Sequence, residues 1–505
     1  MTGRNAALPP GKGKSHMLLH HLVRQLDVLP GSGIPNVEIT GVCEDSRLVA
    51  PGSLFVARSG TKADGKQFLT DAKARGAVAA VVQSQVGGAG LPQLVVKDPG
   101  VAASYLANAF YDHPGRLVRT LAVTGTNGKT TTTYIVRHLL AKLGLRCGMI
   151  GTVEIDDGRT RREASMTTPA ACDIAQLLGA MRDKGCRAAV MEASSHALDQ
   201  GRVAGVPFVG AAFTNLTGDH LDYHKTMDGY AGAKAKLFTN LDPTAVAIIN
   251  QDDEYSTKMI ENCAARIIRF GLRKGADYRA SDVHVTSQGS SFTLHTPEGR
   301  QPVQMQLVGK HNIENVLAAA ALVGEVFGAS LQQLANGLRD AQGAPGRLQA
   351  VRCGQPFAVL VDYAHTDDAL ENVLSALRPL TRGKLRVLFG CGGDRDATKR
   401  PRMARIAEKF ADSVYVTSDN PRTEDPRSIL EQIVGGFSMT GRAKARVEID
   451  RRAAIEHILA EAGPDDIVLL AGKGHENYQI IGTEKRHFDD VEEAVRCLQG
   501  RQIAA

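Results

Sequence analysis

A glycine-rich segment, TGTNGKTTT at residues 124–132, constrains the fold of this chain more than any other feature of its sequence. It follows the apolar run Leu121–Val123 and precedes a stretch of helical periodicity that ends at Gly144. Glycines let the backbone wrap closely around a phosphate, and the free N–H groups at the start of the helix point toward it. Lys129 can neutralise the β- and γ-phosphates, and the Thr130 hydroxyl can bind Mg²⁺. The segment therefore predicts a strand–loop–helix unit of a parallel α/β sheet that binds a nucleotide phosphate.

This loop departs from the common phosphate-loop pattern GxxxxGK[ST], because Val123 stands where the first glycine is expected. The alternative is a glycine-rich strand–helix turn without a ligand. The triplet Gly128-Lys129-Thr130 in this context favours a bound nucleotide. Motor proteins, GTPases and ligases all use such loops, so the loop alone does not identify a reaction.

Length and composition indicate a globular protein of about three domains, since 505 residues exceed one ordinary domain of roughly 150. Hydrophobic residues make up 43% of the chain and charged residues 23%, so each domain can bury a core. The net charge of +6 is dispersed, which does not indicate nucleic-acid binding and is compatible with small anionic substrates. The eight cysteines form no CxxC pair, so we expect reduced thiols and neither a disulfide framework nor a zinc site.

No segment of the sequence predicts membrane insertion. The N-terminal residues lack the uninterrupted apolar core of a signal peptide. The most apolar later stretch, Val316–Phe327, is interrupted by Glu325 and is too short to span a bilayer. We therefore expect a cytoplasmic protein that does not contact a membrane.

Alternation of strand-like and helical segments predicts three α/β domains, at residues 1–113, 114–343 and 344–505. The first carries short apolar strands such as SLFVA and AVAAVV. The second and third alternate apolar runs with helical spacers. This indicates a central, mainly parallel sheet of the P-loop ATPase type and a C-terminal Rossmann-like sheet. Turn signals at Asp112–Gly115 and Gly343–Gly346 mark the boundaries.

A series of further motifs gives the chain a specific resemblance. In order they are MEASSHAL at 191–198, TNL at 214–216, DHLDYH at 219–224, YAGAK at 230–234, GKHNIEN at 309–315, GR at 346–347 and VDYAHT at 361–366. With the phosphate loop, these resemble the Mur ligase and folylpolyglutamate synthetase superfamily, and specifically its Mur branch, over nearly the whole chain from about Glu38. The resemblance implies an ATP-dependent ligase that activates a carboxylate as an acyl phosphate and joins it to an amine.

Two segments narrow the resemblance within the Mur family. Asp45-Ser46-Arg47, with PGSLF and ADG after it, resembles the uridine-nucleotide domain of the family, and DNPR at 419–422 resembles the motif of members that select diaminopimelate over lysine. This implies addition of meso-diaminopimelate to the D-glutamate of UDP-N-acetylmuramoyl-L-alanyl-D-glutamate, in peptidoglycan precursor synthesis. The expected partners are these two substrates and ATP, with no nucleic acid and no membrane, and we expect a monomer.

The resemblance also implies the residues that act on ATP. Glu192 and His220 are expected to hold Mg²⁺ beside Thr130, and Lys234 to carry a carbamate as N6-carboxylysine; these residues and Lys129 form the expected catalytic set. For His220 the alternative is a hydrogen-bonded structural histidine, and for Lys234 a surface lysine like Lys236. The expected ATP-binding residues are Gly125, Thr126, Asn127, Gly128, Lys129, Thr130, Thr131, Asn315, Arg347 and Asp362.

The UDP-linked substrate has its own expected set. It comprises Ser46, Thr61, Lys62, Ala63, Thr167, Thr168, Ser194, Gln200 and Arg202. Two positions depart from the pattern. Met166 stands where an asparagine often precedes the threonine pair, and Glu44 stands where an apolar residue can occur.

The amino-acid site is the most specific part of the resemblance. Diaminopimelate differs from lysine by one carboxylate, and arginine is suited to bidentate recognition of carboxylates. The expected residues are Arg395, Asp419, Asn420, Pro421, Arg422, Gly472 and Glu476. Taken alone, DNPR could be a simple Asn-Pro turn.

Four other interpretations remain open from the sequence. A lysine-adding Mur ligase should lack Arg422, and a folylpolyglutamate ligase should lack both the uridine-type segment and DNPR. A P-loop regulatory or transport ATPase would hydrolyse ATP without an acceptor. A non-catalytic nucleotide-binding scaffold would have no need for Glu192, His220 and Lys234 together.

Overall fold

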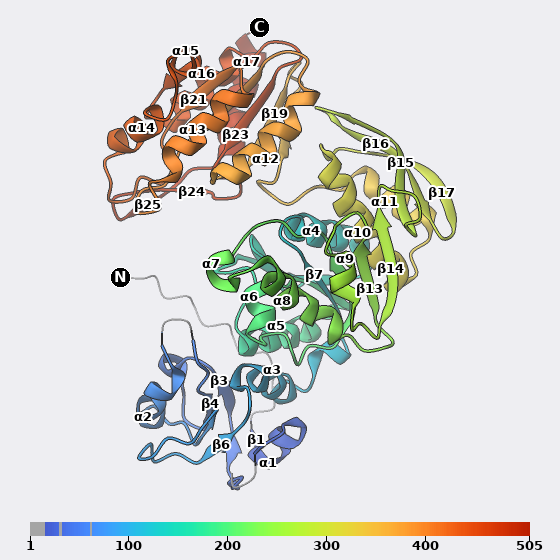
Figure 1. Cartoon of the computed structure of the whole chain (residues 1–505), viewed down its shortest axis with the longest axis vertical. Coiled ribbons are helices and arrows are strands. Elements are labelled where there is room, and N and C mark those ends of the chain that lie inside the picture. The colour runs from blue at the N-terminus through green and yellow to red at the C-terminus, as the bar shows by residue number, and fades with distance from the viewer. Residues whose placement is uncertain (1–15, 30–32, 61–62, 505) are drawn as a thin grey trace. The chain divides into compact units, whose positions relative to one another are not determined.

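The computed structural model of the chain describes residues 16–29, 33–60 and 63–504 (Figure 1). Thr61 and Lys62, two of the residues expected to bind the UDP-linked substrate, lie outside the described residues. The chain forms two compact units. The first comprises Met1–Ala280, Leu294–Gln301 and Glu314–Gly337, and the second Ser281–Thr293, Pro302–Ile313 and Leu338–Ala505.

The N-terminal part of the first unit contains a four-stranded sheet in the order β3-β4-β5-β6, with every neighbouring pair parallel. The helix α3 begins after Asp98, whose carboxylate accepts the backbone N–H groups of Gly100 and Val101. Pro99 fits the first turn because the first N–H groups of a helix need no internal partner. The elements are β1 (Met17–Leu18), α1 (Leu19–Leu22), β2 (Glu38–Ile39), β3 (Gly41–Cys43), β4 (Ser53–Val56), α2 (Leu69–Ala74), β5 (Ala79–Val82), β6 (Gln93–Val95) and α3 (Pro99–Phe110).

An eleven-stranded sheet follows, in the order β10-β9-β8-β11-β7-β12-β13-β14-β15-β16-β17. The strands from β8 to β14 in this order pair in parallel, so the predicted mainly parallel central sheet is confirmed. The phosphate loop follows β7, in the middle of the parallel strands. The strands are β7 (Arg119–Thr124), β8 (Cys147–Ile150), β9 (Glu154–Asp156), β10 (Arg161–Glu163), β11 (Ala188–Glu192), β12 (Phe208–Phe213), β13 (Val246–Asn250), β14 (Arg266–Gly271), β15 (Tyr278–Thr286), β16 (Gly289–Thr296) and β17 (Gly299–Met305).

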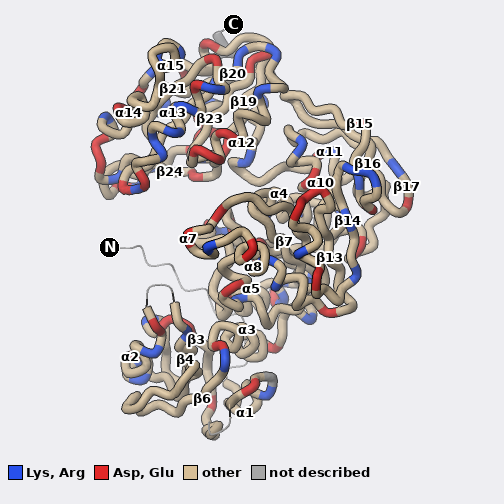
Figure 2. Tube along the Cα trace, in the orientation of Figure 1, with Lys and Arg blue, Asp and Glu red and all other residues tan. Residues whose placement is uncertain are grey.

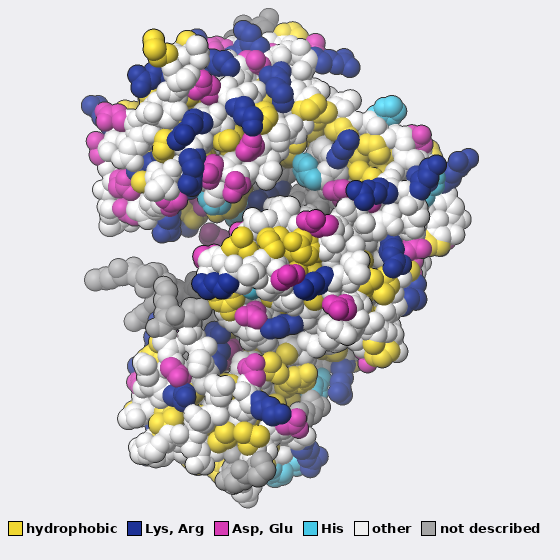
Figure 3. Space-filling view, viewed as in Figure 1, with side chains coloured by type: hydrophobic (Ala, Val, Ile, Leu, Met, Phe, Trp, Pro, Cys, Tyr) yellow, Lys and Arg dark blue, Asp and Glu magenta, His cyan; other side chains and the backbone are white. Residues whose placement is uncertain are grey.

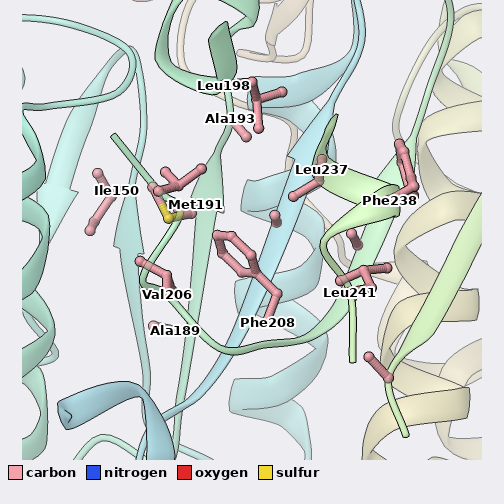
Figure 4. Close-up of a cluster of buried hydrophobic side chains, with 14 of the residues drawn as sticks. Ile150, Ala189, Met191, Ala193, Leu198, Val206, Phe208, Leu237, Phe238 and Leu241 are labelled. Atoms are coloured by element: carbon pink, nitrogen blue, oxygen red, sulfur yellow. The ribbon is translucent and has the colours of Figure 1, made fainter. Parts of the chain in front are cut away.

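A buried cluster fixes the parallel strands against their helices (Figure 4). The cluster includes Met191 of β11, Phe208 of β12, and Leu237 and Phe238 of α8. Burying each such side chain stabilises the fold by about 1.5–3 kcal/mol, which holds the strand ends that carry the site. The helices are α4 (Lys129–Lys142), α5 (Ala171–Asp183), α6 (Ser195–Asp199), α7 (Leu221–His224), α8 (Met227–Thr239), α9 (Ser256–Ile260), α10 (Lys310–Phe327) and α11 (Leu331–Arg339).

The second unit contains a six-stranded sheet in the order β18-β19-β23-β20-β21-β22, parallel except for β18. One buried cluster packs α12, α13 and α14 on one face, and another packs α16 and α17 on the opposite face. This is the predicted Rossmann-like arrangement. The elements are β18 (Gln349–Val351), β19 (Ala358–Asp362), α12 (Asp367–Leu377), β20 (Leu385–Phe389), α13 (Lys399–Phe410), β21 (Ser413–Val416), α14 (Pro426–Val434), α15 (Met439–Lys444), β22 (Ala445–Val447), α16 (Arg451–Ala460), β23 (Ile467–Ala471), β24 (Tyr478–Ile481), β25 (Glu484–His487) and α17 (Asp490–Ala504).

Charges of both signs are interspersed along the chain in each unit (Figure 2), and on the visible face they alternate with small hydrophobic patches (Figure 3). A surface of mixed sign produces little long-range field. Within the described residues, the helices are all too short or too polar to cross a bilayer.

Candidate active site

Two glycines of the loop between β7 and α4 cannot be replaced by larger residues. Gly125 has φ +151°, and an added Cβ would lie 1.9 Å from Thr214 Oγ1. Gly128 has φ +84°, and an added Cβ would lie 2.2 Å from Asn315 Oδ1. The loop therefore passes directly against two of the expected motifs, and only glycine permits this approach.

The TNL motif after β12 holds the other side of the loop. Thr214 Oγ1 donates to the Asn127 carbonyl at 2.6 Å, and the Asn127 N–H donates to Asn215 Oδ1 at 2.9 Å. Thr126 Oγ1 lies 3.2 Å from the Tyr230 hydroxyl of α8. These contacts hold the loop in one conformation before a nucleotide binds.

Two lysines donate to one carbonyl of the loop. Lys129 Nζ lies 2.9 Å from the Gly125 oxygen and 2.8 Å from the Thr126 oxygen. Lys234 Nζ lies 2.7 Å from the same Gly125 oxygen. Burial, with the positive charge of Lys129 as a further cause, holds the pKa of Lys234 well below its usual value. A depressed pKa favours the neutral amine, which is the form that adds CO₂.

The neighbouring lysine on the same helix has a different environment. Lys236 is exposed and pairs with Asp199 at 2.7 Å, whereas only 1% of Lys234 is exposed. The structure thus places Lys234, and not Lys236, at the phosphate loop.

Glu192, at the end of β11, is fully buried beside Thr130. Its Oε2 accepts the Thr130 hydroxyl at 2.9 Å and the Thr152 hydroxyl at 3.0 Å, and its Oε1 accepts the Thr152 N–H at 2.7 Å. A carboxylate and a hydroxyl are the oxygen ligands that Mg²⁺ prefers, so this pair fits the expected ion. Thr152, which orients Glu192, is missing from the sequence-based prediction.

His220 lies in a different setting. It is exposed with φ +53°, and its ring packs 4.8 Å from the His196 ring. Its Nε2 lies 3.4 Å from Asp219 Oδ2. Over the described part of the chain, no three His, Cys, Asp or Glu side chains form a group that could hold a metal. A metal-binding role for His220 therefore stays a prediction.

The residues expected for the UDP-linked substrate adjoin Glu192. Thr152 Oγ1 lies 3.0 Å from Thr167 Oγ1. Thr168 Oγ1 donates to the Glu192 carbonyl at 2.8 Å and lies 3.2 Å from Ser194 Oγ. Part of the expected acceptor site and part of the expected ATP site are thus one hydrogen-bonded cluster in the first unit.

A second group of polar side chains extends this cluster. Arg202 donates to Gln200 Oε1 at 2.7 Å and to the Thr168 carbonyl at 2.8 Å. Arg58, absent from the sequence-based prediction, donates to Gln200 at 3.2 Å and pairs with Glu44 at 3.1 Å. Glu44 also accepts the backbone N–H at the second residue of α5, at position 172. Its carboxylate thus connects the N-terminal sheet to the central one, which accounts for an acid at this position.

Three further positions bear on the site predicted for the UDP-linked substrate, namely Ser46, Ala63 and the divergent Met166. Ser46 is buried at the start of a 3₁₀ turn capped by Asp45. Ala63 is exposed, and its carbonyl accepts the N–H of Gly60. Met166 is 49% exposed, and its sulfur lies 3.7 Å from Arg202 Nη1. The structure thus gives Met166 a contact with the predicted site even though it departs from the usual asparagine.

In the second unit, Asp362 ends β19. It accepts the N–H groups of Leu348 at 2.8 Å and Ala364 at 2.9 Å, and burial raises its pKa. The Arg347 guanidinium lies over the Tyr363 ring at 5.1 Å, and its buried Nε has no hydrogen-bond partner among the described residues. A planar cation with an unused donor fits the predicted phosphate contact.

The loops after β20, β21 and β23 converge at the carboxyl edge of the sheet, where ligands of such folds bind. Asn420 Nδ2 donates to Glu476 Oε2 at 2.8 Å. Arg422 Nη1 donates to the Gly393 carbonyl at 2.8 Å. Arg422 is half-buried with φ +51°, and Arg395 is exposed. The structure thus brings together most of the residues predicted to bind the amino acid, with Asp419, Pro421 and Gly472 in the same loops.

A buried arginine supports these loops. Arg400 of α13 donates to both oxygens of Glu424, at 2.9 and 3.0 Å, and to the Gly392 carbonyl at 3.2 Å. Glu424 also accepts the N–H of Asp394. Arg400 therefore cross-links the loop that carries Arg395 to the loop that carries Arg422. No local pattern marks it, since basic residues are common in a helix of this kind.

Comparison with known proteins finds three family models that match successive parts of the chain. Models described as "Mur ligase family, catalytic domain", "Mur ligase middle domain" and "Mur ligase, glutamate ligase domain" match residues 38–111, 123–323 and 346–474. A UDP-N-acetylmuramoyl-L-alanyl-D-glutamate–2,6-diaminopimelate ligase of Thermosynechococcus vestitus is 46% identical over 494 residues, covering 96% of this chain and 98% of that protein.

The chain belongs to the Mur ligase family.

A protein of the same description from Bacillus cereus is 43% identical to this Mur ligase, covering 96% of this chain and 99% of that protein. A solved structure of a UDP-N-acetylmuramoyl-L-alanyl-D-glutamate–2,6-diaminopimelate ligase has a TM-score of 0.71 at 34% identity, covering 96% of this chain and 99% of that chain. A Mycobacterium tuberculosis folylpolyglutamate synthase has a TM-score of 0.59 at 20% identity, with coverage of 80% and 96%, and so shares the fold alone.

These matches confirm the resemblance drawn from the motifs and the three-part α/β organisation of this Mur ligase. The domain boundaries at 113 and 343, and the role of each site residue, stay predictions.

Proposed function

We propose that this Mur ligase adds meso-diaminopimelate to the D-glutamate of UDP-N-acetylmuramoyl-L-alanyl-D-glutamate, with ATP converted to ADP and phosphate. The observation that carries the proposal is the convergence of Arg422, Asp419 and Glu476 at one sheet edge of the second unit. A guanidinium suits the carboxylate that distinguishes diaminopimelate from lysine, and the acids suit an ammonium group. The Thermosynechococcus vestitus relative named for this reaction is 46% identical to the chain.

The first step is phosphorylation of the acceptor carboxylate. Loop N–H groups and the start of α4 receive the phosphates, and the Lys129 ammonium neutralises their charge. Thr130 and Glu192 would hold Mg²⁺, which supplies further charge neutralisation when bound. Thr167, Thr168 and Ser194, which adjoin Glu192 and Thr152, orient the acceptor so that its carboxylate meets the phosphate.

The second step joins the amine to the activated carboxylate. The amine attacks the acyl phosphate, and the tetrahedral intermediate expels phosphate. Residues of the second unit hold the amino acid by its charged groups and leave one amine free to react. We also propose that the ligase acts as a monomer in the cytoplasm.

Phosphate release is expected to require all three substrates together. ATP with either the UDP-dipeptide or meso-diaminopimelate omitted should release phosphate at a rate near background, because the acyl phosphate needs an acceptor and is discharged by an amine. The measurement is a coupled phosphate assay, with mass spectrometry of the UDP-linked product. Steady ATP hydrolysis without either substrate would instead indicate a regulatory or transport ATPase.

Lys129→Ala is expected to lower turnover by at least about 10²-fold, the scale of losing one strong electrostatic contact to the transition state. The matched control is Lys142→Ala, an exposed lysine at the opposite end of the same helix, which should retain near wild-type turnover. Turnover is measured as phosphate release at saturating ATP. Near-normal activity of the Lys129 variant would refute the phosphate-loop role.

A further inference from the structure

Lys473 lies two residues after the end of β23 and has no role in the two reaction steps proposed for the ligase. Its side chain is fully buried, and its Nζ has no hydrogen-bond partner in the part of the chain that the structure describes. Asp419 Oδ1, also buried, has none either, and it lies 3.5 Å from the lysine Nζ. Glu476 Oε2 lies 3.7 Å from the same Nζ. A buried ammonium thus faces two carboxylates predicted to bind the amino acid.

Other titratable and charged groups lie near Lys473, Asp419 and Glu476, but they do not replace the positive charge of Lys473. They are Arg347, Tyr363, His365, Cys391, Arg422 and Arg451. Arg451 is matched by Asp490, with a separation of 2.6 Å between fully buried side chains. Arg422 is directed to the Gly393 carbonyl. Lys473 is therefore the close counter-charge for Asp419 and Glu476.

We propose that Lys473 is a positioning residue, within 3.7 Å of both Asp419 and Glu476, whose charge balances theirs so that both carboxylates can accept hydrogen bonds from a substrate ammonium. The proposal rests on the proposed function, because it concerns the site assigned there to meso-diaminopimelate.

Burial raises the pKa of Glu476, and the charge of Asp419 raises it further, while Lys473 opposes both effects. Two close carboxylates without a counter-ion share a proton, as neighbouring acids do in other sites. Removing the lysine charge therefore leaves a protonated, neutral acid where the substrate ammonium needs an anion. Because this acid has a raised pKa, the defect is present at low pH and disappears as the pH rises through that pKa.

Lys473→Met keeps most of the side-chain volume and removes the charge. At the low end of a pH series the KM for meso-diaminopimelate is expected to rise by about 10-fold or more, the scale of losing a hydrogen bond to a charged group. Over a pH series, the ratio of variant to wild-type KM should fall as the pH rises through the raised pKa of Glu476. The KM for ATP and for the UDP-dipeptide should stay within about twofold of wild type. The control is Lys485→Met, an exposed lysine 3.6 Å from the same Tyr478 ring that Lys473 approaches at 5.7 Å.

The double variant Lys473→Met/Glu476→Gln keeps the test decisive if the single variant does not fold. It leaves Asp419 without a second acid with which to share a proton, so it should fold and show a KM ratio independent of pH. A single-variant KM that is unchanged, or raised equally at every pH, would overturn the proposal, as would a pH-dependent ratio in the double variant. Failure of the proposed function is distinct, because the wild type itself would then not consume meso-diaminopimelate.

Discussion

The kcat/KM for L-lysine is expected to be at least about 10⁴-fold below that for meso-diaminopimelate, the scale of discrimination when a polar site is left unpaired. Lysine lacks the carboxylate that would meet Arg422, so the guanidinium would lose its charged partner on binding. Arg422 is half-buried, and its Nη1 donates to the Gly393 carbonyl. Steady-state kinetics with both amino acids measure the ratio.

Arg422→Ala should raise the KM for meso-diaminopimelate by about 10- to 100-fold, as expected for losing hydrogen bonds to a charged group. The KM for ATP and for the UDP-dipeptide should change little. Lysine use should improve relative to meso-diaminopimelate, although Arg395 still disfavours it. Arg486→Ala, an exposed arginine on β25, is the control. Efficient lysine addition by the wild type would contradict the substrate assignment while leaving the ligase assignment intact.

Lys234→Ala should lose about 10²–10³-fold in turnover, with partial rescue by short free carboxylates that mimic a carbamate. The physical reason is the buried amine beside the Gly125 carbonyl, whose depressed pKa favours the form that adds CO₂. Activity is measured as phosphate release with and without added carboxylate.

Lys236→Ala is the matched control for this prediction, because Lys236 lies two residues further along the same helix and is exposed. It should retain wild-type turnover and gain nothing from added carboxylate. If Lys236→Ala is inactive and Lys234→Ala is normal, the modified lysine has been placed wrongly.

The strands that the sequence predicted are those with compact apolar runs. SLFVA and AVAAVV form β4 and β5 of the N-terminal sheet, and the run Leu121–Val123 lies in β7 of the central sheet. The strands β15–β17 were not predicted, because their polar residues give no such run. In β15, buried residues occur mainly at its start, and exposed and half-buried positions then alternate to its end. A strand with one solvated face is difficult to distinguish from a polar loop by composition alone.

The candidate site shows a similar division. Lys129, Glu192 and Arg422 each belong to a short contiguous motif, so the sequence alone nominates them, and their roles stay predictions. Thr152 and Arg58 could not be predicted, because each is hydrogen-bonded to a site residue 40 or more positions away in the sequence. Lys473 had a weak signal, as a lysine between two glycines directly after an apolar strand. Only the folded chain places it between two acids.

The cross-link made by Arg400 bears on attempts to change substrate preference by exchanging segments between relatives. The DNPR segment carries the Arg422 guanidinium, but its geometry depends on Glu424 two residues later and on a helix residue in α13. Transplanting only the four DNPR residues into a lysine-adding relative would transfer the Arg422 guanidinium without the Arg400–Glu424 contact that holds its loop. A successful graft would need the loop after β20, the loop after β21 and the buried arginine moved as one block.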